Sequence, residues 1–333
     1  MVITILLSFR NEAGNIDELI RRCRAALDRA GVEHEFVFVD DVSNDGSREI
    51  LERYAAEDPR IKVLTMSRRF GHPACMMAGF AHATGDAVIY LDADLQDPPE
   101  LIPDLVAEFK NGADVVNTTR TERLGENRFK MVLTKFGYWL INVFSDTDIP
   151  METSNFKLTS RRVVEQLLRL REYDPFLRGL VRWVGFKQVQ IFYRREPRHA
   201  GATHFPLHEL APAKDLIAGI TSFSSAPLYF SLLCGFVVSA GSFGYIVYIV
   251  ITRLAFGMHN PGWPAEMVTI LLLGGVILFT NGILGIYVAG IHRDVKRRPS
   301  YIVASAVNVP VVYQCERAPA ADAAGPSRSG TAD

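Results

Sequence analysis

The sequence predicts an α/β fold, in which a mainly parallel sheet has helices on both faces and is followed by two transmembrane helices. Over the N-terminal part, short apolar runs alternate with helical patterns, as in parallel sheets whose strands are joined by helical crossovers. Further along, Leu228–Thr252 and Met267–Ile291 are apolar and contain no charged residue. Each of these runs exceeds the ~20 apolar residues that a helix needs to cross a bilayer.

The first expected elements are a strand at Val2–Leu7 and a helix that begins at Asn15. Apolar residues recur every three or four positions in this helix, and Asn15 with Glu18 three residues later has the pattern of a capping box. The other strands of the N-terminal part are expected at Phe36–Val39, Lys62–Met66, Ala87–Leu91 and Asp114–Thr118, and its other helices at Ser47–Ala56, Pro73–Ala83 and Glu100–Lys110.

Beyond residue 120 the pattern is looser and more basic. The expected elements are a helix at Met131–Phe144, a strand at Phe156–Leu158, a helix at Ser160–Leu170 and a strand at Gln188–Tyr193. Pro206–Ser225 has an apolar side opposite Lys214 and Asp215, which fits a helix on a membrane surface or an ordinary packing helix. The tail from Glu316 is rich in Ala, Pro, Ser and Gly and is expected to be disordered.

The charges limit the partners and set the orientation. With 36 basic and 37 acidic residues the net charge is −1, which excludes a generally basic nucleic-acid binder. Residues 292–298 are basic and directly follow the second apolar run, whereas the connector after the first has Arg253 as its only Lys or Arg. The positive-inside rule places the N-terminal domain and the C-terminus in the cytoplasm. The four cysteines have no metal-ligand spacing and fit reduced cytoplasmic thiols.

Carboxylates gather where the expected strands end. Glu12 follows the first strand, Asp40-Asp41 follow the second, and Asp92 and Asp94 follow the fourth. Ligands of such sheets bind beyond the carboxyl ends of the strands, so these groups should share one crevice. Residues i and i+2 of a strand project to one side, so Asp92 and Asp94 can hold a hard cation together with a diphosphate. Alone, the triplet also fits a charged turn before a helix.

The cation expected in this crevice is Mg²⁺ or Mn²⁺. Like charges held close together repel, so the crevice needs a cation, and a divalent ion bridging a diphosphate would also activate a phosphate leaving group. Arg68-Arg69 and several arginines after residue 120 follow nearby. Acidic metal ligands beside arginines suit two substrates that both carry phosphate.

Four motifs carry a family resemblance. They are VDDVSNDGS at residues 39–47, SRRFGH at 67–72, LDADLQDPPE at 91–100 and FLRG at 176–179. From about residue 2 to residue 300 the chain resembles the polyisoprenyl-phosphate glycosyltransferases of family 2, the group of dolichol-phosphate mannose synthase and bactoprenol glucosyltransferase. The resemblance implies a GT-A, Rossmann-like catalytic domain that moves one sugar from a nucleotide-sugar to a polyprenyl phosphate. A UDP-hexose and undecaprenyl phosphate are the expected pair, and a single in-line displacement would invert the anomeric centre.

The resemblance also implies roles for individual residues. The expected ligands of the nucleotide-sugar are Asn11, Glu12, Asp41, Arg68, Asp92 and Ala93. The catalytic set would be Asp92, Asp94 and Gln96, of which Asp92 and Asp94 would bind the metal. The acceptor phosphate would be held by Arg120, Arg123 and Arg198. For any one of these arginines, a solvated face or contact with lipid headgroups is the alternative.

The implied organisation is that of a multi-pass protein of the bacterial inner (cytoplasmic) membrane. Its parts would be a cytoplasmic GT-A catalytic domain (1–205), an interfacial amphipathic helix (206–226), transmembrane helices (227–253 and 266–291), a basic cytoplasmic segment (292–315) and a disordered tail (316–333). Relatives of this kind suggest a homo-oligomer such as a tetramer, and Gly274-Gly275 and Gly282–Gly285 permit close helix contact in a bilayer.

The chain departs from the family pattern at several positions. Val42 and Arg69 stand where relatives have Gly and Asn, and Thr203-His204-Phe205 stands for Ser-Lys-Tyr. Residues 154–158 read SNFKL where the family often has GDFRL, so Asn155 replaces an Asp proposed as catalytic base. A phosphate monoester has a second pKa near ~6, so little proton remains for a base to remove at neutral pH. We therefore expect an active enzyme with an altered acceptor or donor pocket.

Two other functions stay open. Processive polysaccharide synthases share this catalytic fold, but they usually carry Gln-x-x-Arg-Trp where this chain has Gly179-x-x-Arg182-Trp183, and two spans are few for a polymer channel. The non-enzymatic alternative is a degenerate nucleotide-sugar-binding membrane protein. Intact Asp92, Asp94 and Gln96 argue against it, because a binder need not keep a metal centre.

Overall fold

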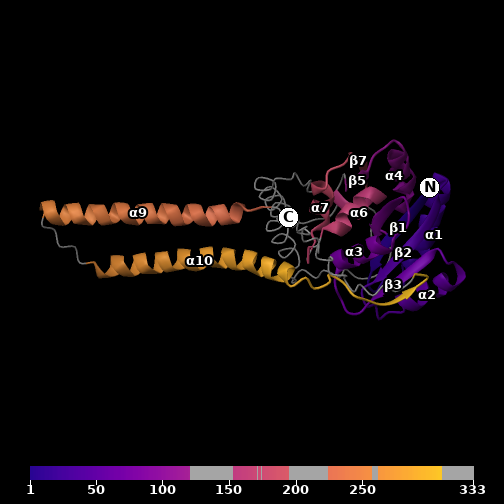
Figure 1. The fold of residues 1–333 in the computed structure, drawn as a ribbon, viewed down its shortest axis with the longest axis horizontal. Coiled ribbons are helices and arrows are strands. Elements are labelled where there is room, and N and C mark those ends of the chain that lie inside the picture. Colours follow the sequence, from indigo (N-terminus) through magenta and orange to yellow (C-terminus); the bar gives the residue numbers. More distant parts are fainter. Residues whose placement is uncertain (121–152, 171, 174, 195–223, 257–261, 310–333) are drawn as a thin grey trace, which may run out of the picture.

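An eight-stranded sheet of order β7-β5-β6-β4-β1-β2-β3-β8 forms the centre of the molecule (Figure 1). The computed structural model describes residues 1–120, 153–170, 172–173, 175–194, 224–256 and 262–309. The strands are β1 (Val2–Phe9), β2 (Glu33–Asp40), β3 (Ile61–Met66), β4 (Ala87–Asp92), β5 (Val115–Arg120), β6 (Thr153–Ser160), β7 (Gln188–Tyr193) and β8 (Val303–Val307). β6 and β8 run antiparallel to their neighbours, and the other strands share one direction. The mainly parallel sheet expected from the sequence is confirmed.

Helices cover both faces of the sheet, also as expected. One face carries α1 (Ile16–Ala30), α2 (Ser47–Glu57), the 3-10 turn η1 (Pro99–Leu101) and α4 (Ile102–Lys110), and the opposite face carries α3 (His72–His82), α6 (Arg161–Arg169) and α7 (Leu177–Trp183). α7 was not expected from the sequence; it is a short helix that contains Gly179.

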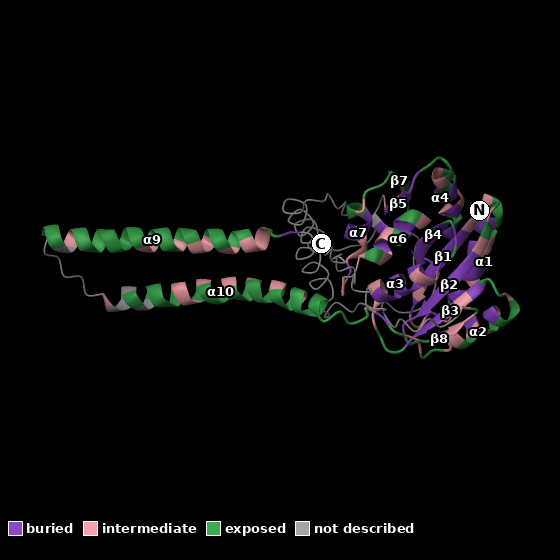
Figure 2. Cartoon of the chain, viewed as in Figure 1, coloured by how far each residue is buried: buried purple, intermediate pink, exposed green. Residues whose placement is uncertain are grey.

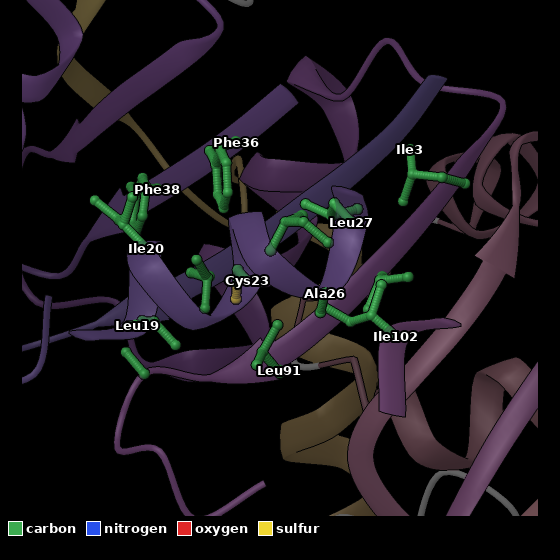
Figure 3. Packing of buried hydrophobic residues seen from close by; sticks show 14 of the residues in the cluster. Ile3, Leu19, Ile20, Cys23, Ala26, Leu27, Phe36, Phe38, Leu91 and Ile102 are labelled. Atoms are coloured by element: carbon green, nitrogen blue, oxygen red, sulfur yellow. The ribbon is translucent and has the colours of Figure 1, made fainter. Parts of the chain in front are cut away.

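Each face has its own hydrophobic core. Along β1, Ile3 and Leu7 pack with Leu27 of α1, whereas Leu6 points to the other side and packs with Phe80 of α3. Figure 3 shows the first of these cores, and Figure 2 shows the purple, buried sheet between the helical layers. Because successive side chains of a strand point to opposite faces of the sheet, β1 contributes residues to both cores. Burying one such Leu or Phe side chain contributes about 1.5–3 kcal/mol.

The predicted capping box at the start of α1 is wrong. Asn15 occupies the N-cap position, but it makes no side-chain cap hydrogen bond. Its Nδ2 donates instead to Oε2 of Glu12 at 2.5 Å, and Glu18 forms an ion pair with Arg21 at 2.6 Å. Glu12 is buried, so satisfying its carboxylate outweighs the cap.

Two long helices, α9 (Ala226–Phe256) and α10 (Trp263–Val295), extend side by side away from the sheet (Figure 1). Within them, Ala226–Thr252 and Val268–Val295 are long and apolar enough to cross a membrane, and these segments are not buried against the rest of the chain. Figure 2 shows their exposed surfaces in green. They coincide with the two transmembrane helices expected from the sequence.

After α10 the chain returns to the sheet as β8, a strand that the sequence analysis did not anticipate. β8 is antiparallel to β3, with Val303 opposite Met66, and Ser67 N donates to the carbonyl of Ile302 at 2.9 Å. α10 ends at Val295 and β8 begins at Val303, so a link of seven residues (296–302) joins them. The chain thus enters the sheet at the carboxyl end of β3. The carboxyl ends of the parallel strands consequently face the long helices (Figure 1).

Some expectations lie outside the described residues. These are the helix at Met131–Phe144, residues 206–223 of the expected interfacial helix (206–226), the disordered tail at 316–333, and the residues Arg123, Arg198, His204 and Cys315. Cys23, Cys75 and Cys234 are described, and all three are free thiols.

Candidate active site

Polar side chains of neighbouring strands meet at the carboxyl edge, on the face covered by α3. Ser8 of β1 pairs in register with Asp92 of β4. Lys157 of β6 pairs with Tyr90 of β4, and Asn155 lies two residues further along β6, level with Asp92. Because side chains alternate along a strand, Ser8, Asp92 and Asn155 project to the same face. The fold therefore brings residues from three distant parts of the sequence to one site.

The expected Asp92/Asp94 corner follows β4 directly. Asp92 and Asp94 are partly exposed, while Ala93 and Leu95 between and after them are buried. Asp94 Oδ1 accepts a hydrogen bond from the backbone N–H of Gln96 at 3.1 Å. Leu95 has a φ of 58°, in the left-handed region that costs a side chain free energy. Burial of Leu95 compensates for this strain and fixes the turn that presents both carboxylates.

The donor set at this corner fits a divalent cation shared with a substrate. Within the described ranges, no three or more His, Cys, Asp or Glu side chains gather as they do in an all-protein metal site. Mg²⁺ commonly takes one or two carboxylates from the protein and completes its shell with phosphate oxygens and water, and Mn²⁺ prefers the same ligand types. Asp92 and Asp94 would supply the protein's share of such a shell.

Asp41, an expected nucleotide ligand, organises the loop between β3 and α3. Its Oδ1 accepts from the backbone N–H of Phe70 at 2.7 Å, and its Oδ2 accepts from that of Gly71 at 3.0 Å. The adjacent Asp40 is buried and accepts from Ser43 N at 2.8 Å; burial raises the pKa of Asp40 above its ordinary value, in spite of the hydrogen bonds from Ser43. Asp41 therefore ties the end of β2 to the loop before α3.

Asn11 and Glu12 lie in a network that joins the loops after β1 and β2. Ser43 Oγ accepts from Asn11 N at 3.0 Å, and Asn11 Oδ1 accepts from Asn44 N at 2.9 Å. Ser47 Oγ likewise accepts from Glu12 N at 3.0 Å. Asn11 has a φ of 57°, a conformation that Asn tolerates better than most residues. Both residues expected as nucleotide ligands thus hold the loops after β1 and β2 together at the carboxyl edge of the sheet.

The two described arginines among the expected ligands lie in different surroundings. Arg68 is exposed, and its guanidinium carbon lies 4.1 Å from the ring centroid of Phe70. Arg120 is mostly buried and donates to Asp97 Oδ1 at 3.3 Å and to the hydroxyl of Tyr193 at 3.1 Å. Burial alone would lower the pKa of Arg120, but Asp97 and Tyr193 raise it above its ordinary value. Arg120, the expected phosphate ligand, is thus paired inside the protein.

Sequence reasoning missed a hydrogen-bonded chain beside Asp92. Ser8 Oγ lies 2.6 Å from His72 Nδ1, His72 Nε2 lies 3.4 Å from Asn155 Nδ2, and Arg178 Nε donates to Asn155 Oδ1 at 3.0 Å. His72 and Arg178 stand in two of the quoted motifs but received no role. The sequence carried no signal that both residues contact Asn155, because 106 residues separate His72 from Arg178.

The parallel sheet, the strand-end carboxylates and the ordered loops define a GT-A-type sugar-nucleotide fold. Residues 4–168 match the family description "Glycosyl transferase family 2". The chain is 39% identical over 300 residues to the uncharacterized glycosyltransferase YkcC of Bacillus subtilis (strain 168), covering 90% of this chain and 92% of that one. It is 37% identical over 306 residues to the bactoprenol glucosyl transferase of Shigella phage SfII, covering 91% and 97%.

A solved structure, mannosyl-3-phosphoglycerate synthase from Rubrobacter xylanophilus, is 19% identical with a TM-score of 0.46, covering 66% of this chain and 72% of that one. The chain belongs to glycosyl transferase family 2, and within it to the polyprenyl-phosphate glycosyltransferases. It is therefore a glycosyltransferase, and the non-enzymatic alternative is set aside.

Proposed function

We propose that the protein transfers a single sugar from a nucleotide-sugar, a UDP-hexose, to a polyprenyl phosphate, with inversion at the anomeric carbon. The helices α9 and α10 would anchor it in the cytoplasmic membrane with the sheet on the cytoplasmic side. One observation carries this proposal: the Asp92/Asp94 corner lies on the same edge of the sheet that β8 connects to α10. A site at this edge can receive a nucleotide from the cytoplasm and a phosphate from the bilayer surface.

The residues at this edge of the sheet would bind the parts of the nucleotide-sugar donor. The loop residues Asn11, Glu12 and Asp41 would contact the nucleoside, and Asp92 and Asp94 would hold a divalent cation. When bound, that cation would neutralise the diphosphate and make it a better leaving group. Gln96, whose backbone is bonded to Asp94, would lie beside the transferred sugar.

Alignment and charge neutralisation are the main contributions that this reaction requires of the protein. The acceptor oxygen is already anionic because the second pKa of a phosphate monoester lies near ~6. Holding the two substrates in line can supply about 7–11 kcal/mol of the barrier. Asn155 in place of Asp is compatible with this mechanism, since no general base is needed.

The proposal is tested by incubating membranes that contain the protein with undecaprenyl phosphate and a panel of radiolabelled nucleotide-sugars, followed by lipid extraction. We expect label in the lipid fraction with one donor, no transfer after chelation of divalent ions, and recovery on adding Mn²⁺ or Mg²⁺. Asp94→Asn should reduce transfer at least about 100-fold, the range found when a transition-state electrostatic contact is lost.

Asp104→Asn is the matched control, because Asp104 is an exposed carboxylate on α4 away from the edge. Transfer that survives both chelation and Asp94→Asn would contradict the metal-dependent mechanism. The size of the product separates the proposal from its rival: one sugar per lipid supports it, and a polymer would instead identify a processive synthase.

A further inference from the structure

The link between α10 and β8 (residues 296–302) begins with three consecutive basic residues. Lys296, Arg297 and Arg298 are exposed, and among the residues that the structure describes their side chains form no ion pair or hydrogen bond. Asp294 is the one carboxylate within residues 292–298, and it accepts a hydrogen bond from the backbone N–H of Tyr173 at 3.1 Å. The start of the link is therefore a surface of net positive charge that is open to an anionic partner.

The proposed anchoring of α10 places these cations at the level of the lipid phosphates. The apolar segment Val268–Val295 has 28 residues. At 1.5 Å per residue, a helix of that length is about 42 Å long, and a bilayer with its headgroups is about 40–45 Å thick. Residues 296–298 follow this segment directly, on the side of the sheet. A basic residue in this position strengthens binding to an anionic membrane surface by about fivefold.

The other end of the link is fastened to the sheet. Tyr301 is buried in the hydrophobic core on the α3 face, and the carbonyl of Ile302 accepts from the backbone N–H of Ser67 at 2.9 Å. The next residue, Val303, pairs with Met66 at the end of β3. Ile302 comes four residues after Arg298, so the chain between them spans at most about 14 Å. A contact made by the basic residues is thus transmitted over a short distance to the end of β3.

The loop after β3, residues 67–71, lies between this link and the candidate active site. Its first residue is bonded to the link, as described above. Near its other end, the backbone N–H groups of Phe70 and Gly71 donate to the carboxylate of Asp41 at 2.7 and 3.0 Å. Phe70 also packs against the same hydrophobic core as Tyr301. The loop therefore connects the basic residues beside the membrane to Asp41, an expected ligand of the nucleotide-sugar.

We propose that Lys296, Arg297 and Arg298 bind anionic phospholipid headgroups of the surrounding bilayer, and that this contact acts through β8 to hold the loop 67–71 in place for the nucleotide-sugar. The inference rests on the proposed function in taking α10 as a membrane anchor and the loop as part of the donor site. A loop that the bilayer already holds opens less often, and a donor then binds without the entropy cost of ordering it.

The test compares the wild type in nanodiscs of phosphatidylcholine with the wild type in nanodiscs of equal parts phosphatidylcholine and phosphatidylglycerol, without substrates. Amide hydrogen exchange measures how often the N–H groups of Phe70 and Gly71 leave Asp41. We expect exchange at least about fivefold slower in the anionic nanodiscs, the lower end of typical coupling between two sites. Salt at about 1 M should remove the difference, because it shortens the Debye length to roughly 3 Å. Equal exchange in the two nanodiscs would overturn the inference.

Variants of the basic residues identify the source of the response. The triple change Lys296→Gln, Arg297→Gln and Arg298→Gln should exchange in anionic nanodiscs at the rate that the wild type shows in phosphatidylcholine. The double change Arg297→Lys and Arg298→Lys keeps the charges and should keep the response. Three exposed cations on α1, α2 and α4 provide a matched control with the same loss of charge: Arg29→Gln, Arg53→Gln and Lys110→Gln. A response that survives the triple change of the link, or that the control also loses, contradicts the role of these residues.

A longer link separates lipid binding from its transmission. Inserting Gly-Ser-Gly-Ser between Pro299 and Ser300 keeps the basic residues and β8 but loosens the connection between them. We expect this variant to co-purify with phosphatidylglycerol in preference to phosphatidylcholine, as the wild type does, but to show no slower exchange at Phe70 and Gly71 in anionic nanodiscs. Slower exchange in spite of the insertion would show that the bilayer does not act through the link.

Two further outcomes separate this inference from the proposed function. In phosphatidylcholine nanodiscs with undecaprenyl phosphate as the anionic lipid at low content, we expect no slower exchange; a response to this lipid alone would make the link an acceptor site and overturn the inference. Where a donor supports transfer, its KM should be about fivefold lower in the anionic nanodiscs. If no donor supports transfer but exchange responds to phosphatidylglycerol, the reaction is misassigned while the lipid contact stands.

Discussion

Removing the carboxylate of Asp97 should destabilise the protein more than any exposed charge change. Asp97 is fully buried, and its oxygens accept from Arg120 Nη2 at 3.3 Å, from Ser154 Oγ at 3.2 Å and from the hydroxyl of Tyr193. Asp97→Ala would leave all three donors without this acceptor. Breaking a buried pair costs about 3–5 kcal/mol. Because the Arg120 side chain keeps 22% of its exposure, we expect the lower end, about 3 kcal/mol.

For a domain of this size, each kcal/mol shifts the melting temperature by about 2–4 °C, so Asp97→Ala should melt roughly 6–12 °C below the wild type. The assay is thermal unfolding of the detergent-solubilised protein followed by near-UV circular dichroism. Asp97→Asn keeps an acceptor oxygen and should show about half the loss. Arg48→Ala breaks an exposed ion pair with Glu52 and should change stability by less than about 0.5 kcal/mol. If Asp97→Ala melts within about 2 °C of the wild type, the buried cluster does not stabilise the sheet as argued.

Three further outcomes follow from strain, burial and the return strand. Val42 has a φ of 63°, a left-handed conformation that costs a β-branched residue about 1–2 kcal/mol. Val42→Gly would remove this strain at an entropy cost of ~0.5–1 kcal/mol, so it should raise the melting temperature. A lower melting temperature would show that Val42 is not strained. Lys157 keeps its proton to about pH 10.5 when unfolded but only to about 7 when folded. Between these pH values the unfolded state therefore binds more protons than the folded state, and the free energy of unfolding should rise by about 2 kcal/mol from pH 7 to pH 9. Lys157→Met should abolish this rise, which is measured by thermal unfolding at several pH values. Asn308 Nδ2 donates to the carbonyls of Ala55 and Ile61 at 2.6 and 2.8 Å, so Asn308→Ala should cost about 1–3 kcal/mol and speed hydrogen exchange in β3; unchanged exchange would show that β8 is held elsewhere.

The sheet could be predicted from the sequence because its signals are local. Apolar runs such as Ala87–Leu91 mark buried strands, and each expected strand lies within a residue or a few of the observed one. β8 could not be found in this way, because Val303–Val307 is a short run whose pairing with β3 depends on the path of α10. α7 was missed for a related reason: Gly179 weakens the helical pattern, and packing of Leu180 and Val181 stabilises the helix.

The site could be located but not assigned in detail. Strand-end carboxylates were expected in one crevice, and the strand order brings the carboxyl ends of β1, β2 and β4, which precede them, side by side at one edge of the sheet. What each side chain contacts depends on loops far apart in the sequence: Asn11 bonds to Ser43 and Asn44, and Asp41 bonds to Phe70 and Gly71. A sequence pattern names the residue types that a nucleotide needs. It does not show that their hydrogen-bonding atoms are already used to hold the loops.

The departures at positions 155 and 157 are best understood together. Relatives often place Asp and Arg there, two residues apart on a strand, where side chains share a face and a carboxylate can balance a guanidinium. Here Asn removes the negative charge, and Lys157 replaces a cation that is always protonated by one whose pKa is lowered to about 7. A change of Asn155 alone to Asp would therefore place the carboxylate against Arg178, whose Nε donates to Asn155 Oδ1 at 3.0 Å, and leave Lys rather than Arg at position 157. The informative variant is the double change Asn155→Asp with Lys157→Arg: if the two positions compensate for each other, the double variant should transfer sugar to polyprenyl phosphate faster than Asn155→Asp alone.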